Sequence, residues 1–270
     1  QLVRKEQLSN AIALNAAGMS LMTLLSPAIA GGLYAWTGPD IVYFVIAALS
    51  GLGLVFTTMV PRIGGAQTGP KGAVMSDIIE GLAYIRRSPI VRILLIIGLV
   101  TTLLAMPVRF LMPVLVVSIY NLGPDSLGLL LTVMGVGSLV GTLFIAWVGR
   151  WRRGLMLLAG SFASGVALVM LAVLPFYAVA AAIMVLLGLG DASRRALNQA
   201  LAMEEVEDQY RGRVMSVFMM NFGLMPLGVL PMGLVADAYG GQAAVGTLGV
   251  LLLAVTAVLL ATQGQLRRMQ

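Results

Sequence analysis

Long apolar stretches separated by short polar connections run along this chain from end to end. Eight of these stretches reach the ~20 residues that an α-helix needs to cross the hydrocarbon core of a bilayer. None shows the two-residue alternation of a membrane β-strand. The stretches span residues 11–35, 41–60, 90–119, 127–148, 155–173, 177–199, 214–237 and 243–262. The pattern predicts an all-α integral membrane protein with eight transmembrane helices.

The composition supports this fold class and excludes most enzyme chemistry. The 270 residues are 59% hydrophobic and only 10% charged, whereas a soluble domain carries about 25% charged residues. Cysteine and histidine are both absent, which removes thiol nucleophiles, disulfides, histidine bases and histidine metal ligands. The nucleotide-binding pattern G-x-x-x-x-G-K-[ST] is also missing. We therefore expect no catalytic residues, no metal, no cofactor and no enzymatic activity.

The distribution of basic residues predicts the orientation of the spans. The formal net charge is +6, from 17 Lys and Arg against 11 Asp and Glu. Alternate connections carry no Lys or Arg at all, namely residues 37–40, 120–126, 174–176 and 238–242. Basic residues gather in the cytoplasmic loops of membrane proteins. We therefore expect both termini in the cytoplasm and the protein in the plasma (inner) membrane, and we attribute the basic excess to topology and not to nucleic-acid binding.

One cytoplasmic connection is longer than the others and has two parts. Residues 61–70 are rich in Gly and Pro and are typical of a flexible linker. Residues 74–87 follow with helical periodicity, with Val74, Ile78, Leu82 and Ile85 on an apolar stripe and Asp77, Glu80, Tyr84 and Arg87 on a polar one. Such a helix is expected to lie along the membrane interface. The chain is thus organised as two spans, a linker with an amphipathic helix, and six spans.

Three segments resemble parts of the Major Facilitator Superfamily, in the branch with macrolide-efflux and enterobactin-export proteins. Residues 2–15 (LVRKEQLSNAIALN) are similar to the start of its fifth helix. Residues 77–89 (DIIEGLAYIRRSP) are similar to its central linker helix, and residues 210–216 (YRGRVMS) to the loop before its eleventh helix. The order and spacing of the three segments match the family over essentially the whole chain.

The resemblance implies a domain organisation and a function. It identifies residues 1–62 with the last two helices of the N-terminal half, residues 63–88 with the cytoplasmic linker and residues 89–270 with the six-helix C-terminal half, so that the first four of twelve helices are expected to be absent. The implied activity is secondary active transport by alternating access, with gradient-driven efflux of a small amphipathic compound that is drug-like or siderophore-like. The implied coupling ion is a proton, and the full-length protein is implied to be a monomer. One departure is the loop 148–154, which lacks the acid of the family's loop signature.

Arg109 is the first candidate for a substrate or counter-ion contact, because a charged side chain inside a span is costly. It lies in the third predicted span between Pro107 and Pro113. One interpretation places its guanidinium in the central cavity, where it attracts anionic substrates or pairs with an acid. The alternative is an arginine near the outer surface whose side chain extends to water. We expect Arg109 to point into the bundle, toward the gap between the first two spans and the other six.

Asp191 is the second candidate, in the sixth predicted span. An acid inside a span can bind and release a coupling proton. The alternative is a structural ion pair, because i,i+3 and i,i+4 spacing puts Arg194 and Arg195 beside Asp191 on a helix. A paired carboxylate stays ionised and is a poor proton carrier. We expect Asp191 to lie within ion-pair reach of an arginine.

Other polar residues complete the candidate set. Asn15, Thr101, Thr102 and Asn221 lie within spans, where each can contact substrate or form an interhelical hydrogen bond. A cytoplasmic charge network that opens with the cavity is the alternative to a solvated loop, and its candidate members are Arg150, Arg152, Arg153, Glu204, Glu207, Asp208, Arg211 and Arg213.

The small and cyclic residues inside spans predict local geometry. Proline removes a backbone hydrogen bond, so bends are predicted at Pro27, Pro107, Pro113, Pro226 and Pro231. Gly137 and Gly141 form a G-x-x-x-G pattern, which predicts close packing against a neighbouring helix.

Two other functions stay open at this point. An eight-span scaffold, or an inert fragment of a transporter, has the same helices without transport. An intramembrane aspartyl protease is the remote alternative, because residues 188–191 match its G-x-G-D pattern. That chemistry needs two carboxylates that share a proton, and only Asp237, near the opposite surface, is available as the second.

Overall fold

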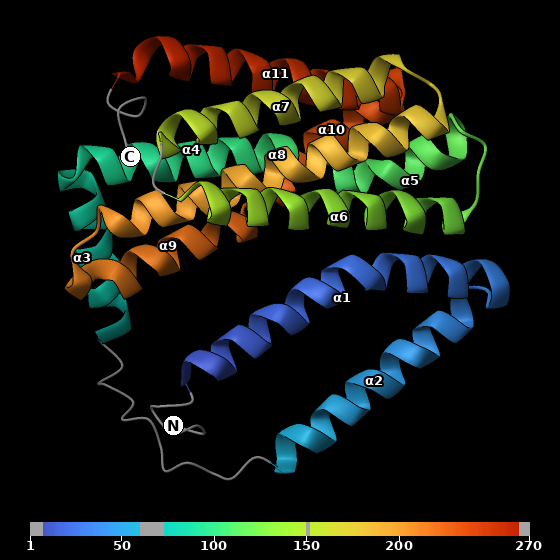
Figure 1. The fold of residues 1–270 in the computed structure, drawn as a ribbon, viewed down its shortest axis with the longest axis horizontal. Helices are drawn as coiled ribbons and strands as arrows, with labels where there is room; N and C mark the ends of the chain where they lie inside the picture. The colour runs from blue at the N-terminus through green and yellow to red at the C-terminus, as the bar shows by residue number, and fades with distance from the viewer. Residues whose placement is uncertain (1–7, 60–72, 150–151, 265–270) are drawn as a thin grey trace.

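The computed structural model describes residues 8–59, 73–149 and 152–264. Within these ranges, only the backbone is described for residues 8–17, 19, 20, 73–78 and 222. Its helices are α1 (Leu8–Thr37), α2 (Pro39–Met59), α3 (Ala73–Arg87), α4 (Pro89–Ala105), α5 (Val108–Ser118), α6 (Pro124–Val148), α7 (Arg153–Val173), α8 (Tyr177–Glu204), α9 (Arg211–Gly223), α10 (Pro226–Tyr239) and α11 (Gly241–Thr262), with a 3-10 turn, η2, at Asp208–Tyr210 (Figure 1). The described residues contain no strand.

Helices that are long and apolar enough to cross a membrane account for most of the chain. Seven helical stretches of the described residues meet both requirements, and they coincide with the second to eighth predicted spans. The predicted all-α membrane fold is therefore confirmed. The first predicted span, 11–35, lies inside α1. Its early side chains are outside the described set, so its crossing of the membrane stays a prediction.

Two of the predicted spans are broken, which corrects their description as single helices. The span predicted at 90–119 divides into α4 and α5 around Pro107, and the span predicted at 214–237 divides into α9 and α10 ahead of Pro226. Proline has no backbone N–H and its ring clashes with the preceding turn, so a helix ends readily in front of it. The two helix breaks thus lie at two of the five prolines where bends are predicted. The other three prolines, Pro27, Pro113 and Pro231, lie inside continuous helices.

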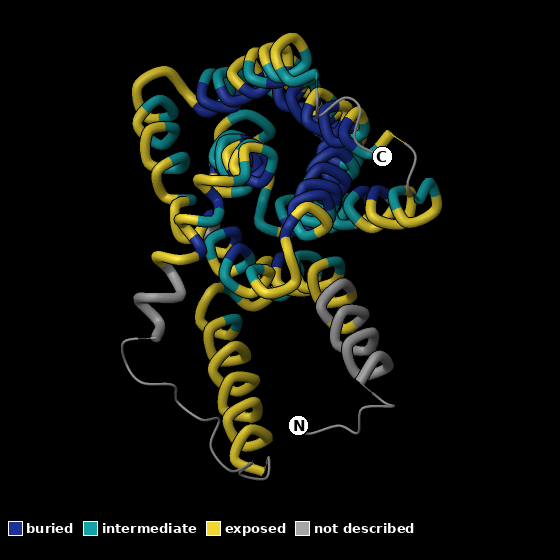
Figure 2. Tube along the Cα trace, turned by 90° about the vertical axis from the view of Figure 1, so that its left-hand side faces the viewer, coloured by how far each residue is buried: buried dark blue, intermediate teal, exposed yellow. Residues whose placement is uncertain are grey.

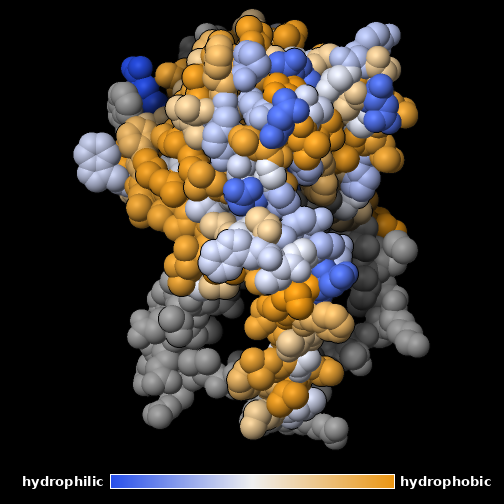
Figure 3. Space-filling view, turned by 90° about the vertical axis from the view of Figure 1, so that its right-hand side faces the viewer, coloured by the Kyte–Doolittle hydropathy of each residue, from blue (hydrophilic) through white to orange (hydrophobic). Residues whose placement is uncertain are grey.

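Helices α4 to α11 pack around a shared apolar core, and α1 and α2 lie along one side of it (Figure 1). The largest core cluster includes Leu115, Leu130, Leu168, Met184 and Leu248, each at most 1% exposed. Helix α2 has no buried residue and is exposed along its length (Figure 2). Hydrophobic side chains cover most of the described part of the limb formed by α1 and α2 (Figure 3). Lipid tails are as apolar as these side chains, so an exposed apolar helix suits a bilayer.

Close backbone contact holds α1 to α6 near the end where α1 meets α2. A Cβ atom added to Gly31 would lie 2.7 Å from the carbonyl oxygen of Pro124, and one added to Gly128 would overlap the carbonyl of Pro27. Away from this contact, the two helices diverge toward the opposite end of the bundle (Figure 1). Thr23 and Pro27 of α1 line the cavities described below.

Helix α3 lies across the end of the bundle where α4 begins (Figure 1). Its helical conformation is as predicted from the periodicity, and its described apolar stripe divides between two environments. Ile85 is buried at 9% exposure, whereas Leu82 is 51% exposed and is available to the membrane interface. Tyr84 stacks on Tyr210, with ring centroids 4.4 Å apart. The amphipathic helix is thus anchored on the protein along one side only.

Glycines bring α6 and α8 into direct backbone contact. A Cβ atom on Gly137 would overlap the carbonyl of Val185, and one on Gly141 would lie 2.6 Å from the carbonyl oxygen of Leu189. From the other side, a Cβ atom on Gly188 would overlap the carbonyl of Met134. The close packing predicted from Gly137 and Gly141 is confirmed, and α8 supplies the partner surface.

We predict that Gly188→Ala destabilises the protein, because the added methyl group meets the α6 backbone, which cannot turn aside as a flexible side chain can. The expected loss is about 1–3 kcal/mol of unfolding free energy, the usual cost of overpacking. Thermal unfolding of the purified protein followed by circular dichroism measures it. Gly53→Ala in α2 is the matched control, since no atom lies within 4 Å of its added Cβ. Equal effects of the two substitutions would contradict the tight α6–α8 contact.

Candidate functional site

Asp191 lies near the middle of α8, in a part of the helix that is enclosed on two sides. Gly188 brings α8 against α6, and Gly190 brings it against α7, where an added Cβ atom would lie 2.7 Å from the carbonyl oxygen of Gly160. Small residues at these positions let the backbones approach closely. The carboxylate that follows them is consequently buried, with Asp191 at 3% exposure.

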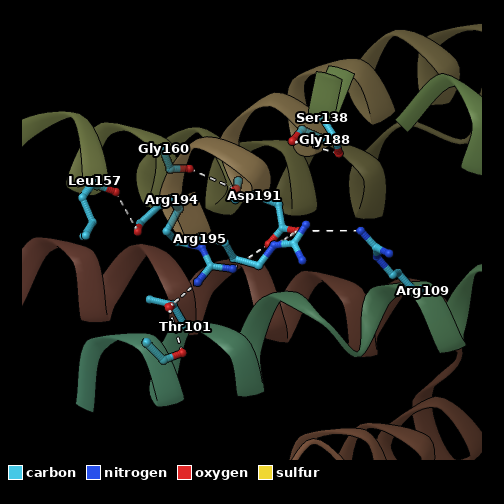
Figure 4. A network of polar contacts seen from close by, with 12 residues as sticks. Thr101, Arg109, Ser138, Leu157, Gly160, Gly188, Asp191, Arg194 and Arg195 are labelled. Atoms are coloured by element: carbon cyan, nitrogen blue, oxygen red, sulfur yellow. Dashed lines mark hydrogen bonds and ion pairs between the residues drawn. The ribbon is translucent and has the colours of Figure 1, made fainter. Parts of the chain in front are cut away.

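Three guanidinium groups surround this one carboxylate (Figure 4). Asp191 Oδ1 lies 2.5 Å from Arg194 Nη2, and Asp191 Oδ2 lies 3.2 Å from Arg195 Nε. The i,i+3 and i,i+4 spacing on α8 brings these two arginines to it, as expected. The third is Arg109 of α5, whose Nη2 lies 3.7 Å from Asp191 Oδ2. The two main candidates of the sequence are therefore members of one cluster.

Arg194 is the structural member of the cluster. It is 1% exposed, and besides its ion pair it donates a hydrogen bond from Nη1 to the hydroxyl of Thr101 on α4. That hydroxyl in turn donates to the carbonyl oxygen of Ile97 at 2.6 Å. A buried charge is tolerated when it is paired and hydrogen-bonded in this way. Arg194 thus ties α8 to α4, and Thr101 belongs to this tie.

Arg109 and Arg195 differ from Arg194 because their side chains are 34% and 35% exposed. Arg109 follows the break between α4 and α5, where its backbone N–H donates to the carbonyl oxygen of Met106 at 3.2 Å. Its guanidinium points to the bundle and to Asp191 (Figure 4), as expected from the cost of a charge that faces lipid. The interpretation as an arginine that extends to the outer surface is not supported.

Small cavities adjoin both exposed guanidinium groups. A cavity of about 120 Å³ next to Arg109 is lined by Thr23, Pro27, Arg109, Leu131, Met134, Gly135 and Ser138. One of about 200 Å³ next to Arg195 is lined by Thr23, Gly135, Ser138, Leu139, Thr142, Ala192 and Arg195. Both lie between α1, α6 and the cluster. Arg109 therefore faces the gap between the first two helices and the rest, which is the position expected of it.

The neutral polar candidates fall into different places. Thr102 and Asn221 line a cavity of about 90 Å³ on the other side of Arg195, together with Gln199. Thr101 is committed to Arg194, as described above. The side chain of Asn15 lies outside the described residues. Three of the four candidates thus adjoin the arginine cluster, although their part in transport stays a prediction.

Sequence reasoning missed the exposed role of Arg195, which it treated only as a partner of Asp191. It also missed Thr23 as a lining residue of the cavities beside the arginines. The spacing along α8 contained a partial signal, since Arg194 and Arg195 point about 100° apart on a helix of 3.6 residues per turn. Which of the two would face a cavity depends on the neighbouring helices.

The cytoplasmic charge candidates form separate pairs in the described residues. Arg153 Nη1 lies 2.5 Å from Glu204 Oε1, and Arg211 Nη1 lies 2.7 Å from Asp208 Oδ1. Arg213 Nη1 lies 2.7 Å from Glu80 Oε2 on the linker helix α3. Arg152 is exposed at the start of α7 with a left-handed backbone, φ 43°. Arg150 lies outside the described residues.

Glu207 forms hydrogen bonds with neutral groups. Its carboxylate accepts a hydrogen bond from Gln209 at 2.9 Å, and its backbone N–H donates to the hydroxyl of Tyr84 at 3.2 Å. The acid missing from the loop 148–154 is supplied from elsewhere, because Glu204 at the end of α8 pairs with Arg153. These local pairs tie neighbouring helix ends together, and their opening with the cavity stays a prediction.

We predict that Asp191→Asn lowers the free energy of unfolding by about 3–5 kcal/mol, because removal of one partner leaves buried guanidinium charge uncompensated. Asp237→Asn is the matched control. Asp237 is exposed near the end of α10, so we expect a change of no more than about 0.5 kcal/mol. Thermal unfolding of both variants measures the difference. A stability of Asp191→Asn equal to that of the control would contradict the central place of this carboxylate.

Comparisons with known proteins identify the family of this chain. The family model of the Major Facilitator Superfamily matches residues 1–228. Macrolide efflux protein A of Streptococcus pyogenes is 26% identical over 252 residues, which cover 88% of this chain and 60% of that protein. Multidrug efflux pump Tap of Mycolicibacterium fortuitum is 30% identical over 243 residues, which cover 83% of this chain and 59% of that protein. Staphyloferrin A transporter of Staphylococcus aureus is 26% identical over 168 residues, which cover 59% of this chain and 41% of that protein.

The matches cover most of this chain but only part of the length of its relatives. The chain spans about 60% of the length of the macrolide efflux protein, whereas the family model covers most of this chain. The helical composition and the seven apolar helices of membrane-spanning length fit the same family. The chain therefore belongs to the Major Facilitator Superfamily.

Proposed function

We propose that this protein is a secondary active transporter that exports a small amphipathic compound by alternating access. The observation that carries the proposal is the Asp191–arginine cluster, which lies inside the spans and opens on cavities beside α1. Charged groups within a membrane are expensive and mark substrate or ion pathways. Two relatives are named for macrolide or multidrug efflux, which favours export over import.

The position of the cluster supports substrate binding. Transporter sites lie between structural halves and are built near broken helices. Arg109 lies directly after the break between α4 and α5, and its cavity is lined from α1 by Thr23 and Pro27. Residues 1–62 and 89–270 would then belong to the two halves that move against each other. The breaks ahead of Pro226 and around Pro107 are suitable places for helices to bend during that movement.

Coupling to a proton gradient is part of the proposal, but Asp191 is not assigned as the proton carrier. Its carboxylate is surrounded by three guanidinium groups, which stabilise the ionised form. The other acids within the described residues lie in α3, at the ends of the spanning helices or in connections. Asp191 is better explained as the residue that positions Arg109 and Arg195.

The two alternative functions gain little from the geometry. A protease of the aspartyl class needs a second carboxylate close to Asp191, and Asp191 is instead surrounded by arginines, with Asp237 exposed at the end of α10. A scaffold without transport has no need of exposed guanidinium groups beside cavities inside the spans. Transport by the protein in a cell membrane distinguishes the remaining possibilities.

We predict that cells expressing the protein accumulate less of at least one compound from an amphipathic panel, and that a protonophore abolishes the difference. Arg109→Ala should remove this efflux at unchanged protein level, because the guanidinium that faces the cavity is lost, and Arg109→Lys should restore part of it. Accumulation of radiolabelled or fluorescent compounds measures the effect.

Arg92→Ala is the matched control for this experiment, since Arg92 is an exposed arginine at the start of α4. We expect it to leave efflux unchanged. Panel-wide accumulation that is the same with and without the protein would refute export. If efflux survives a protonophore but fails when the gradient of another ion is removed, that ion and not the proton is the coupling ion.

A further inference from the structure

We propose that the substrates are amphipathic organic anions, whose acidic group binds between Arg109 and Arg195 and whose apolar body occupies an adjoining cavity between α1, α2, α5 and α6. This inference rests on the proposed transport function and names its substrate class. It follows from two independent features of the described residues, the charge balance of the cluster and the connection of the cavities.

The charge balance of the cluster is positive. One carboxylate, Asp191, faces three guanidinium groups, so the cluster carries two uncompensated positive charges among the described residues. The described acids other than Asp191 lie outside this part of the spans. A low-dielectric surrounding strengthens the repulsion between like charges. An anion that binds here relieves that repulsion, whereas a cation increases it.

Arg109 and Arg195 are the two groups able to make the contact. Arg194 is 1% exposed and committed to Asp191 and Thr101. The other two are each about one third exposed, and their distances to Asp191 of 3.7 and 3.2 Å are longer than the 2.5 Å of Arg194. The two guanidinium groups also approach the same oxygen, Asp191 Oδ2. The acidic group of a ligand that binds next to Asp191 can therefore accept hydrogen bonds from α5 and from α8.

A larger apolar cavity adjoins the cavities beside these arginines. This cavity of about 430 Å³ has walls from α1, α2, α5 and α6, which include Pro27, Tyr34, Val42, Val116 and Leu131. It shares Pro27 and Leu131 with the cavity at Arg109, which in turn shares Thr23, Gly135 and Ser138 with the cavity at Arg195. Shared walls place the three cavities in a row along α1 and α6.

The row of cavities matches one molecular shape. The volume of its apolar end falls within the ~300–1,000 Å³ range of small-molecule sites. This end is lined mainly by apolar side chains, and the hydroxyl of Tyr34 is a polar exception. Its other end holds two guanidinium groups and the hydroxyls of Thr23 and Ser138. A compound with a hydrophobic body and one carboxylate or phosphate fits both ends at once. An anionic lipid has the same chemistry, and the test separates the two sources.

A matched pair of fluorescent probes tests the charge. Dansylglycine is an amphipathic anion and dansylcadaverine carries the same fluorophore on a cation. Binding to the purified protein in phosphatidylcholine nanodiscs is measured by fluorescence titration without any ion gradient. We expect dansylglycine to bind at least about tenfold more tightly than dansylcadaverine, the range expected for one hydrogen bond to a charged group. Equal affinities, or preference for the cation, would overturn the inference.

Substitutions locate the two ends of the site. Arg109→Ala and Arg195→Ala should each weaken dansylglycine binding about tenfold or more, Arg109→Lys less so, and the control Arg92→Ala should leave it unchanged. Leu131→Phe fills the junction between the apolar cavity and the Arg109 cavity, so it should weaken binding while both arginines stay in place. Leu129→Phe, 51% exposed on the same helix, should not. Unchanged binding in Arg109→Ala and Leu131→Phe would overturn the assignment, and melting temperatures verify that each variant is folded.

Two further outcomes separate this inference from its basis. In the first, phosphatidylglycerol is added to the nanodisc. If it displaces dansylglycine at equal concentration, the site belongs to lipid and the claim about exported substrates is overturned. Selective dansylglycine binding without export in cells would leave the anion site standing while transport fails. Export of compounds from the panel without any dansylglycine binding would overturn the anion site and leave the transport proposal standing.

Discussion

The buried carboxylate of Asp191 is the interaction on which the polar interior of this protein depends. It lies between Arg194, Arg195 and Arg109, and it compensates charges from two helices that would otherwise repel each other in a medium of low dielectric constant. The enclosure of that carboxylate requires Gly188 and Gly190, which let α6 and α7 approach α8. Packing and electrostatics are therefore coupled at one turn of α8, and only the part of the charge that faces the cavities remains available to a ligand.

The two kinds of ion pair in this protein serve different purposes. Inside the spans, Arg194 is desolvated, and its two terminal nitrogens are paired with Asp191 and Thr101. At the helix ends, Arg153–Glu204 and Arg213–Glu80 are partly or largely exposed, and exposed pairs of this kind contribute no more than about 1 kcal/mol each. Pairs this weak are easily exchanged, whereas the removal of one partner from a buried pair is costly. This division suits a transporter whose binding site is fixed while its ends open and close.

The sequence by itself determined the class of the protein and the helices that compose it. Apolar length, the absence of two-residue alternation and the scarcity of charge are local properties, so the spans, the amphipathic segment 74–87 and the Gly137–Gly141 contact could be predicted without coordinates. Prolines indicated the bends for the same reason, because the missing N–H acts on the turn next to it. Arg109 and Asp191 also stood out as candidates, since any charge in an apolar span is conspicuous.

Only the tertiary structure decided how these candidates combine. The meeting of Arg109 with Asp191 depends on the break between α4 and α5, after which the side chain of Arg109 reaches α8. The helices that cover each side of α8 decide that Arg195 faces a cavity and Arg194 does not. The same holds for Glu204, which supplies the acid that the loop 148–154 lacks. Sequence periodicity specifies which residues share a helix face, but the neighbour of that face is set by contacts between distant segments. The row of cavities along α1 and α6 belongs to this second category, because its walls come from helices separated by many residues in the chain.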